Sequence, residues 1–586
     1  MSQPPKSMPY SGTKLIDALS KQHEKRSQSE LFKSGIFTLD WRSKVGSFPH
    51  PDQETLVSAG EPCGAWNPHA SRPEDKRTLS ENLKLFEKLP LNGYVPATSI
   101  RGIVRAWVSQ YPELIRQMRE LLGYQNGADI YAGKIEFLDA FPHQPTKLTL
   151  DITNPQQDFQ VFHTGSTSPQ SLYTLGDGHE KIEITIGIRG TRNAQPEDVA
   201  TVWEWLQQAL ITQGIGSRTA SGYGALMAPT GYDPSAELPS LPVGYSSKKL
   251  GFRLYSQGSA GQDQFKPELR PTHWRGWLRS WLMRFFLGVM EKSDAEITVN
   301  ELLGSLKDKG LVRLRVTNDR MDPSRNTPKF YRWMGSFEIS APTDILNEII
   351  LPVIKIAVRV GGVGRGWRRP LHRFILETKA GGKFDTARGC HIELTRSRSV
   401  SVRVGDSLPL GTASACAERE SRAEVITNST PTKLDKAGND LNLIYAVWRD
   451  GVVSNWIDRY REHLSIISAE VFSPTTCAVY LVPEPYQNPI DPKTLTWIQC
   501  ETPATRGRGM ELIYQPKYKR QADVGGKTSA CSWVSIKRVN GAKPEDTCQE
   551  VVCIFMGNKN ILRSDFLADL AKVPGAVCLF GKESSN

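Results

Sequence analysis

A sequence pattern that occurs twice limits the folds open to this chain more than any other feature. Residues 96–107 read PATSIRGIVRAW, and residues 271–281 read PTHWRGWLRSW. Both contain the string R-G-x-(V/L)-R-x-W behind a proline. Each is followed later by a glycine-rich stretch, at residues 214–224 (GIGSRTASGYG) and 361–369 (GGVGRGWRR). Two motifs that recur in the same order indicate a duplicated domain.

The apolar periodicity around the first pair of motifs predicts a domain of mixed helices and strands. Alternating apolar residues predict strands, and apolar residues spaced three and four apart predict helices. We expect strands at residues 36–42, 134–141, 147–153, 182–188 and 225–227, and helices at residues 96–122 and 196–212. In chain order this is the β-α-β-β-α-β pattern of a ferredoxin-like (RRM-like) domain with long insertions. The longest insertion, at residues 44–94, is rich in Pro, Gly and Ser.

The second pair of motifs lies in a segment with the same predicted order. We expect strands at residues 250–255, 311–316, 333–340 and 373–376, and helices at residues 272–289 and 343–360. The chain then divides into a polar N-terminal arm (1–30), a first domain (31–228), a Pro-rich linker (229–247), the core of a second domain (248–379) and a C-terminal region (380–586). The C-terminal region, with a predicted helix at 441–464, is either an elaboration of the second domain or a third module. The expected fold class is α+β, with two ferredoxin-like domains in tandem.

The charge of the chain concerns its partners rather than its fold. A formal net charge of +11 over 586 residues favours a polyanion such as nucleic acid.

The sequence carries no motif for a zinc ion or a nucleotide. The nine cysteines form no C-x-x-C pair, which argues against a zinc site, and unpaired cysteines fit a reducing cytoplasm. Residues 525–528 (GGKT) resemble the end of a Walker A loop. Position 521 is Gln where that loop needs Gly, so no nucleotide cofactor is expected.

The sequence contains no segment that predicts secretion or membrane insertion. The N-terminus is polar and lacks an apolar stretch, and no window approaches about 18 consecutive apolar residues. We therefore expect a cytoplasmic protein without a membrane partner.

The repeated R-G-x-x-R helices have the features of a phosphate-binding site. Arg101 and Arg105 are four residues apart and therefore share a helix face, as do Arg275 and Arg279. Both pairs lie in opening helical turns, where free backbone N–H groups and the helix dipole favour an anion. The glycine between the members of each pair keeps that surface low enough for a nucleic-acid backbone to approach. For a single copy, the alternative is a solvated basic helix whose tryptophan packs inward.

The glycine stretches predict tight turns whose successive N–H groups form anion-binding nests. Tyr223 and Trp367 offer ring faces on which RNA bases can stack. The alternative is an ordinary tight turn between a helix and a strand. From both motifs in both halves we predict this set of RNA-binding residues: Ser99, Arg101, Gly102, Arg105, Gly214, Gly216, Ser217, Arg218, Thr219, Tyr223, Arg270, Arg275, Gly276, Arg279, Gly362, Gly364, Arg365, Trp367, Arg368 and Arg369.

These motifs resemble those of the RAMP superfamily of CRISPR–Cas proteins, the RNA-recognition-like subunits of type III effector complexes. Residues 31–228 resemble a type III-B backbone subunit through residues 94–105 and 214–224. Residues 248–376 resemble a second such domain through residues 270–281, although its glycine turn reads R-G-W-R-R in place of S-R-T-A-S-G-Y-G. Two fused domains are similar to the fused subunits of type III-D variants.

The resemblance implies an RNA-binding backbone subunit that holds CRISPR RNA and its single-stranded target RNA beside other effector subunits. In several members of the superfamily, an Asp in the long loop after the first strand cuts target RNA with a divalent cation such as Mg²⁺, which helps to align the attacking 2′-OH. The matching candidates are Asp52 in the first domain and Asp263 in the second. Members without cleavage activity exist, so the resemblance leaves open whether this chain is a metal-dependent endoribonuclease.

Two other functions fit the same sequence. A stand-alone RAMP endoribonuclease that processes CRISPR RNA precursors usually relies on a general base such as His. His273 and His372 are the candidates, but the two domains carry no His at matched positions. The second alternative is a general RNA-binding protein outside CRISPR systems.

Overall fold

The chain folds into helices and sheets that form two compact units. The computed structural model describes residues 13–44, 47–49, 56–58, 62–65, 93–153, 157–165, 170–227, 242–260, 267–305, 310–377, 381–395, 468–498, 507–526, 530–539 and 547–581, except residues 145, 147, 365, 488 and 559. The first unit comprises Met1–Pro155, Ser166–Gly244 and Ala260–Thr272. The second comprises Gln156–Gly165, Tyr245–Ser259 and His273–Asn586. The mixture of helices and strands confirms the predicted α+β class.

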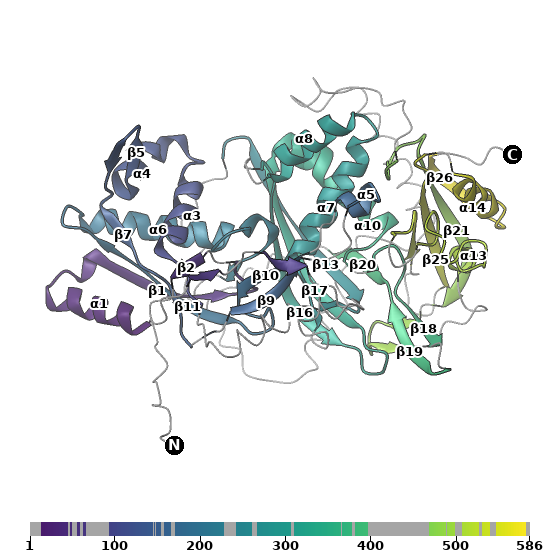
Figure 1. The fold of residues 1–586 in the computed structure, drawn as a ribbon, viewed down its shortest axis with the longest axis horizontal. Helices are drawn as coiled ribbons and strands as arrows, with labels where there is room; N and C mark the ends of the chain where they lie inside the picture. The colour runs from purple at the N-terminus through teal and green to yellow at the C-terminus, as the bar shows by residue number, and fades with distance from the viewer. Residues whose placement is uncertain are drawn as a thin grey trace, which may run out of the picture. The chain divides into compact units, whose positions relative to one another are not determined.

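The first unit is built on an antiparallel sheet with two main helices (Figure 1). Its four main strands are β1 (Phe32–Leu39), β7 (Ile135–Phe137), β11 (Ile182–Gly190) and β12 (Leu226–Met227). Their order in the sheet is β12-β1-β11-β7, and β8 (Phe141–Pro142) also pairs with β11. Helix α3 (Ala97–Val108) lies between β1 and β7 in the chain, and helix α6 (Pro196–Gln213) lies between β11 and β12. The apolar faces of both helices pack into one core with β1 and β11.

The first unit contains further elements besides this sheet. They are α1 (Thr13–Lys25), α4 (Ile115–Leu122), the hairpin of β5 (Tyr124–Asn126) and β6 (Asp129–Tyr131), the hairpin of β2 (Ser47–Pro49) and β3 (Leu56–Ser58), and a three-stranded sheet of β4 (Pro62–Ala65), β10 (Gln170–Leu175) and β9 (Leu148–Thr153). Helix α5 (Gln157–Val161) belongs to the second unit. The single helix predicted at residues 96–122 is in fact two helices. Helix α3 ends at Val108, and Pro112, which cannot lie inside a helix without removing a hydrogen bond, opens a short 3-10 turn (Pro112–Leu114) before α4. The predicted strand at 147–153 forms, but it joins the three-stranded sheet.

The second unit contains a sheet of the same order. Its strands are β13 (Tyr245–Ser256), β16 (Arg313–Pro323), β17 (Tyr331–Pro342) and β20 (Cys390–Thr395), arranged β16-β17-β13-β20. Helices α7 (Pro271–Phe286) and α8 (Lys292–Leu303) lie between β13 and β16 in the chain. Between β17 and β20 lie α9 (Thr343–Ile345), the π-helix η4 (Leu346–Ile350) and α10 (Leu351–Val360). In α7, the ring of Trp274 lies 4.5 Å from that of Phe252 and 4.9 Å from that of Phe337, which packs the helix on one face of the sheet.

The predicted closing strand of this sheet was wrong. Residues 373–376 lie in β18 (His372–Glu377), which pairs with β19 (Lys383–Arg388) in a separate hairpin. Strand β20 closes the sheet by pairing with β13. The physical reason is burial: Ile392 and Leu394 of β20 are buried, whereas Ile375 is 57% exposed and Phe384 is 59% exposed. Apolar residues alternate in β20 and are consecutive at 374–376, and both patterns are compatible with a buried strand, so the sequence alone does not distinguish the two segments.

The C-terminal region forms a sheet of its own. Its strands are β21 (Cys477–Gln487), β24 (Val534–Val539), β25 (Thr547–Phe555) and β26 (Val577–Gly581), arranged β24-β25-β21-β26. Helix α13 (Arg508–Ile513) lies between β21 and β24, and helix α14 (Ile561–Ala571) lies between β25 and β26. A separate apolar core, which includes Met510, Ile536 and Phe566, holds these elements together. The short hairpins β14–β15 (Ser259–Ala260, Pro267–Glu268) and β22–β23 (Ile490–Asp491, Thr496–Trp497) complete the described strands. The helix predicted at 441–464 lies outside the described residues.

Candidate nucleic-acid interface

The first basic motif lies at the start of α3, on the surface of the first unit. The N–H of Ala97 donates to Asp139 Oδ1 at 2.8 Å, which fixes the first turn of the helix. Arg101 and Gly102 are exposed and Ser99 is half-buried. A Cβ atom on Gly102 would meet nothing within 4 Å, so this glycine borders open space as the sequence predicts. A backbone phosphate can therefore approach this turn closely.

The second arginine of the motif has the same structural role in both copies. The Arg105 guanidinium donates to the carbonyl oxygen of Gly123, the C-cap residue of α4. The Arg279 guanidinium donates to the carbonyl oxygen of Gly304, the C-cap residue of α8, at 3.2 Å, and also to Asn300. Cations stabilise the C-terminus of a helix because its last carbonyls have no partner inside the helix. The repeated motif thus joins its own helix to the next one.

The remaining members of the motif separate into an interior and an exterior set. Trp107 and Trp281 are buried in the cores of their units, as expected for an inward tryptophan. Burial first, and then the positive charge of Arg101, lower the pKa of Arg105. Burial, with a contribution from Arg279, lowers the pKa of Arg275 to about 10. Among the described residues Arg101 forms no ion pair, so it is the exposed cation of the first motif.

The first glycine turn follows α6 and needs its glycines for their backbone conformation. Gly214, Gly216, Gly222 and Gly224 have φ between 70° and 90°, and a Cβ on Gly224 would overlap the carbonyl oxygen of Ile215. The N–H groups of the turn donate to the protein itself: Ile215 to Gly224, Ser217 to Lys44, Ser221 to Arg218, Gly222 to Thr219 and Gly224 to Arg42. These five groups therefore do not form the predicted anion nest. Ser217 and Arg218 remain exposed at the tip, and Thr219 is half-buried.

Tyr223 does not provide the predicted stacking surface. It is 1% exposed, and its ring centroid lies 4.9 Å from that of Trp41. Its hydroxyl donates to Asp151 Oδ2 at 2.5 Å. Burial first, and then the Asp151 carboxylate, raise the pKa of Tyr223. The residue that the motif suggested as a base platform is instead part of a buried polar network.

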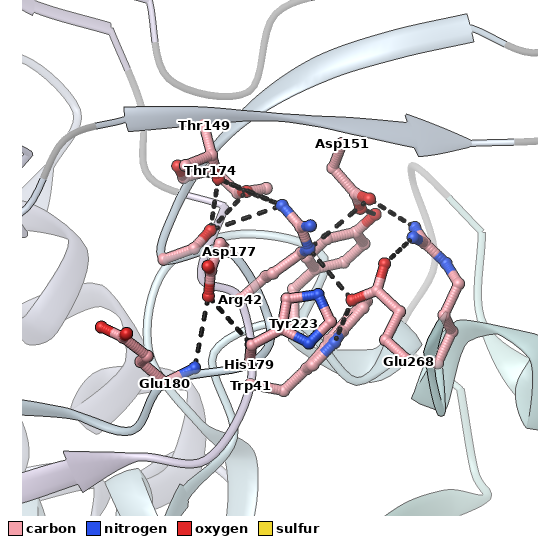
Figure 2. Close-up of polar contacts among 12 residues, drawn as sticks. Trp41, Arg42, Thr149, Asp151, Thr174, Asp177, His179, Glu180, Tyr223 and Glu268 are labelled. Carbon is pink, nitrogen blue, oxygen red and sulfur yellow. Dashed lines mark hydrogen bonds and ion pairs between the residues drawn. The ribbon is translucent and has the colours of Figure 1, made fainter. Parts of the chain in front are cut away.

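We call this network the Asp151 cluster, and Figure 2 shows Asp151 among Arg42, Tyr223 and Glu268. The cluster also contains a predicted RNA-binding arginine, Arg270. Its members are Trp41, Arg42, Asp151, Tyr223, Glu268 and Arg270. Arg270 donates to Asp151 at 2.6 Å and to Glu268 at 2.5 Å. Arg42 donates to Glu268 at 3.3 Å, and its Nε lies 3.7 Å from Asp151. Arg270 is therefore enclosed by the first unit, although the sequence places it at the start of the second motif.

The charges of the Asp151 cluster balance inside the protein. Two guanidinium groups face two carboxylates, and none of the four side chains is more than 4% exposed. Burial alone would raise the pKa of Asp151, but Arg270 and Arg42 outweigh it and lower the pKa. Burial likewise opposes the charge of Arg270, but the two carboxylates outweigh it and raise the pKa of this group. Arg42 also donates to Thr149 at 3.1 Å and to Thr174 at 3.3 Å. No spacing in the sequence indicated Arg42, Asp151 or Glu268, because they are far apart in the chain.

The second glycine turn faces the interior of the second unit. The Trp367 indole donates to Gln160 Oε1 at 3.0 Å, and Arg368 donates to Glu470 Oε1 at 2.5 Å. Arg369 donates to the Val534 carbonyl at 2.6 Å and to the Ser532 hydroxyl at 2.9 Å, both next to or within β24. Gly362 is buried and Gly364 is half-buried; Arg365 lies outside the described residues. Of the arginines expected to bind RNA here, Arg369 joins the turn to the C-terminal sheet and Arg368 is held by a buried carboxylate.

A second buried network, which we call the Glu470 cluster, consists of His163, Arg284, Arg368 and Glu470. Glu470 accepts from Arg284 Nη2 at 2.6 Å, from Arg368 at 2.5 Å and lies 2.9 Å from His163 Nε2. Burial alone would raise the pKa of Glu470, but Arg368 and Arg284 outweigh it and lower the pKa to about 2. One carboxylate thus compensates two enclosed guanidinium groups.

Of the four candidate catalytic residues, the structure describes the two histidines. Asp52 and Asp263 lie outside the described residues, and the described part of the chain contains no group of three His, Cys, Asp or Glu side chains that could hold a metal ion. His372 is buried, with Nδ1 at 2.8 Å from the Pro370 carbonyl and Nε2 at 3.2 Å from the Tyr514 hydroxyl. Both of its ring nitrogens are thus engaged by the protein. His273 lies half-buried on α7.

Comparisons with known proteins give only distant similarities. No protein-family model matches the sequence, and a search among curated proteins found no match. Among solved structures, a chain of the type III-B Cmr-beta complex bound to cognate target RNA aligns with 36% of this chain and 63% of its own length, at 16% identity and a TM-score of 0.24. Cmr6 from Pyrococcus furiosus aligns over 34% of this chain and 97% of its own, at 16% identity and a TM-score of 0.19. Cmr1 from Pyrococcus furiosus aligns over 57% and 99%, at 13% identity and a TM-score of 0.28. These TM-scores are too low to establish a shared fold.

No described helix is long and apolar enough to cross a membrane.

Proposed function

We propose that this chain is an RNA-binding backbone subunit of a type III CRISPR effector ribonucleoprotein. The observation that carries the proposal is a sheet order that occurs three times. In each four-stranded set the order is fourth, first, third, second, with a helix after the first strand and another after the third. This order supports the proposal that each set is a ferredoxin-like domain, and the first two sets carry the repeated R-G-x-x-R helix. A third copy then accounts for the described part of the C-terminal region.

The exposed cations of the first unit are the best candidates for holding RNA. Arg101 lies at the start of α3 and Arg218 at the tip of the glycine turn, and both are exposed. The net charge of +11 favours a polyanionic partner. In this proposal the partners are CRISPR RNA, single-stranded target RNA and other effector subunits in the cytoplasm. Arg105, Tyr223, Arg270, Arg279, Arg368 and Arg369 shape the fold around these contacts, and a direct contact of any of them with RNA stays a prediction.

Purification of the chain from its native cells tests the proposal directly. We expect CRISPR RNA and further effector subunits to copurify, and sequencing of the bound RNA should return spacer and repeat sequences. Recovery of the chain alone, or with unrelated cellular RNA, would contradict the subunit role. Cutting of precursor RNA by the isolated chain without metal would instead support the processing endoribonuclease.

Charge reversal at the two exposed arginines is expected to weaken RNA binding. Hydrogen bonds to charged groups contribute about 1.5–3 kcal/mol, so Arg101→Glu and Arg218→Glu should each lower affinity about tenfold or more. Each lost phosphate contact should also reduce the slope of log K against log salt by about 0.7. Fluorescence anisotropy over a salt series measures both quantities. Arg192→Glu, an exposed arginine of the same unit outside both motifs, is the matched control and should retain the wild-type slope.

Target cleavage is a separate part of the proposal. If Asp52 and Asp263 each hold a divalent cation beside a scissile phosphate, the assembled complex with Mg²⁺ should cut matched target RNA at two positions. Asp52→Ala should remove one product band and Asp263→Ala the other, and chelation of the metal should remove both. Unchanged bands in both variants would overturn the assignment.

A further inference from the structure

The second sheet carries exposed side chains, among them Ser247 and Lys249, on the face opposite helix α7. Helix α7 packs against the face that carries Phe252 and Phe337. Because successive side chains of a strand point to opposite faces, the neighbouring residues of β13, β16 and β17 point away from this helix. We call the far side, between Tyr245 and Gly251, the open face.

The strand register arranges the open face in rows across three strands. Ser247 of β13 pairs with Ser340 of β17, and Ser340 pairs with Arg313 of β16. The next row is Lys249, Glu338 and Arg315, and the row after it is Gly251, Ser336 and Thr317. Contacts confirm that these side chains share one face. The Ser340 hydroxyl donates to that of Ser247 at 3.1 Å, the hydroxyls of Thr317 and Ser336 lie 2.9 Å apart, and Arg313 lies 5.8 Å from the ring centroid of Tyr245.

The open face is cationic and accessible. Its rows contain three cations, Lys249, Arg313 and Arg315, and a single carboxylate, Glu338. Lys249 and Ser247 are exposed, and both arginines are half-buried. Rows two residues apart along a strand are separated by about 7 Å, so the cations of neighbouring rows lie at that spacing along the strands.

The end of the same sheet that contains Arg253 and Tyr255 differs from the open face, because its arginines form ion pairs and an apolar cluster packs on it. There Arg332 pairs with Asp322 at 2.7 Å and Arg253 with Glu393 at 3.5 Å. An apolar cluster that includes Tyr255 and Trp497 covers that end. The described rows of the open face thus contain more cations than carboxylates, whereas each of these two arginines at the other end has a carboxylate partner.

We propose that the open face binds single-stranded RNA. Lys249, Arg313 and Arg315 would contact phosphates, Ser247 and Ser340 would donate to phosphate or ribose oxygens, and a base would stack on Tyr245. Cations beside an aromatic ring on a sheet form the usual platform for single-stranded nucleic acid, and the ring favours RNA over an acidic protein. The inference rests on the proposed RNA-binding function but names a site separate from both glycine turns.

Binding of a labelled oligouridine to the full chain, followed by anisotropy over a salt series, tests the site. Lys249→Glu should weaken binding about tenfold or more and reduce the salt slope by about 0.7. Tyr245→Ala should weaken binding roughly fivefold or more without changing the slope, because a stacked base contributes about 1–3 kcal/mol and carries no charge there. Lys355→Glu, an exposed lysine on α10, reverses the same charge away from the open face and is the matched control.

The outcomes separate this inference from the proposed function. Wild-type affinity of Lys249→Glu, or an equal loss in Lys355→Glu, overturns the open face as a site. A weakened Lys249→Glu with an unchanged Tyr245→Ala overturns the stacking contact. Unaltered circular dichroism spectra establish that the variants are folded. If CRISPR RNA copurifies from cells while Lys249→Glu binds normally, only this inference fails. If oligouridine binding depends on Lys249 but no CRISPR RNA copurifies, only the proposed function fails.

Discussion

Replacement of Glu470 by alanine is expected to lower the free energy of unfolding of the second unit by about 3–5 kcal/mol. The variant leaves the Arg284 and Arg368 guanidinium groups enclosed without the carboxylate that both contact, at 2.6 Å and 2.5 Å. It also removes the group that lies 2.9 Å from His163. Removal of one partner from a buried ion pair is costly because the uncompensated charge stays out of water.

Denaturant unfolding of the full chain, with a signal from the second unit, measures this loss. Glu296→Ala is the matched control because Glu296 is 43% exposed on α8 and faces Lys292 at 3.8 Å across one helical turn. Such exposed pairs contribute about 0.2–0.5 kcal/mol. Equal losses in the two variants would show that the Glu470 cluster does not stabilise the unit.

The same carboxylate predicts a dependence of stability on pH. The folded-state pKa of Glu470 is lowered to about 2 from an ordinary value of 4.5. A lowered carboxyl pKa stabilises the fold at pH values above the unfolded pKa, and this contribution disappears as the pH falls through the folded pKa. The wild-type chain should therefore lose stability between about pH 5 and pH 2 more steeply than Glu470→Gln. Parallel curves for the two proteins would contradict the assignment.

Replacement of Asp151 by alanine is expected to lower the free energy of unfolding of the first unit by about 3–5 kcal/mol. Asp151 accepts from Arg270 at 2.6 Å and from Tyr223 at 2.5 Å, and it lies 3.7 Å from Arg42. Without it, two buried guanidinium groups share the single carboxylate of Glu268. Because Glu268 and Arg270 anchor residues 267–272 to this cluster, we also expect these residues to lose hydrogen-exchange protection.

A graded set of variants checks that the effect comes from charge. Tyr223→Phe removes only the hydrogen bond from the hydroxyl and should cost about 1.5–3 kcal/mol. Asp129→Ala removes an exposed aspartate of the same unit and should change stability by no more than about 0.5 kcal/mol. If Asp151→Ala and Asp129→Ala unfold at the same denaturant concentration, the Asp151 cluster is not a stabilising network.

Local patterns in the sequence predicted the helices of the repeated motif well. The prolines at positions 96 and 271 precede or open α3 and α7. Trp107 and Trp281 are buried, as the alternative interpretation of these helices expected. The strands β11 and β17 were predicted from alternation. Helices and strands of this kind depend on residues that are close together in the chain, so their positions can be predicted from the sequence alone.

The partners of the charged side chains could not be predicted in this way. Arg105 and Arg279 have the spacing of phosphate ligands, but each caps the helix that follows its own. Capping depends on where that helix ends in space, at Gly123 and Gly304. Similarly, the identity of the strand that closes the second sheet depends on its pairing with β13 rather than on its own alternation.

The sequence by itself determined that two motifs recur in the same order, where its basic helices and glycine turns lie, and that the chain carries excess positive charge. The tertiary structure decided which arginines face solvent. Arg101 and Arg218 are exposed, whereas Arg270 and Arg368 contact carboxylates more than a hundred residues away in the chain. Enclosing a guanidinium costs free energy unless a carboxylate meets it, and only the folded chain brings the two together. In both copies of the R-G-x-x-R helix, the second arginine thus binds the end of the following helix. In the first unit, the exposed first arginine of the motif, Arg101, is in addition a candidate contact with RNA.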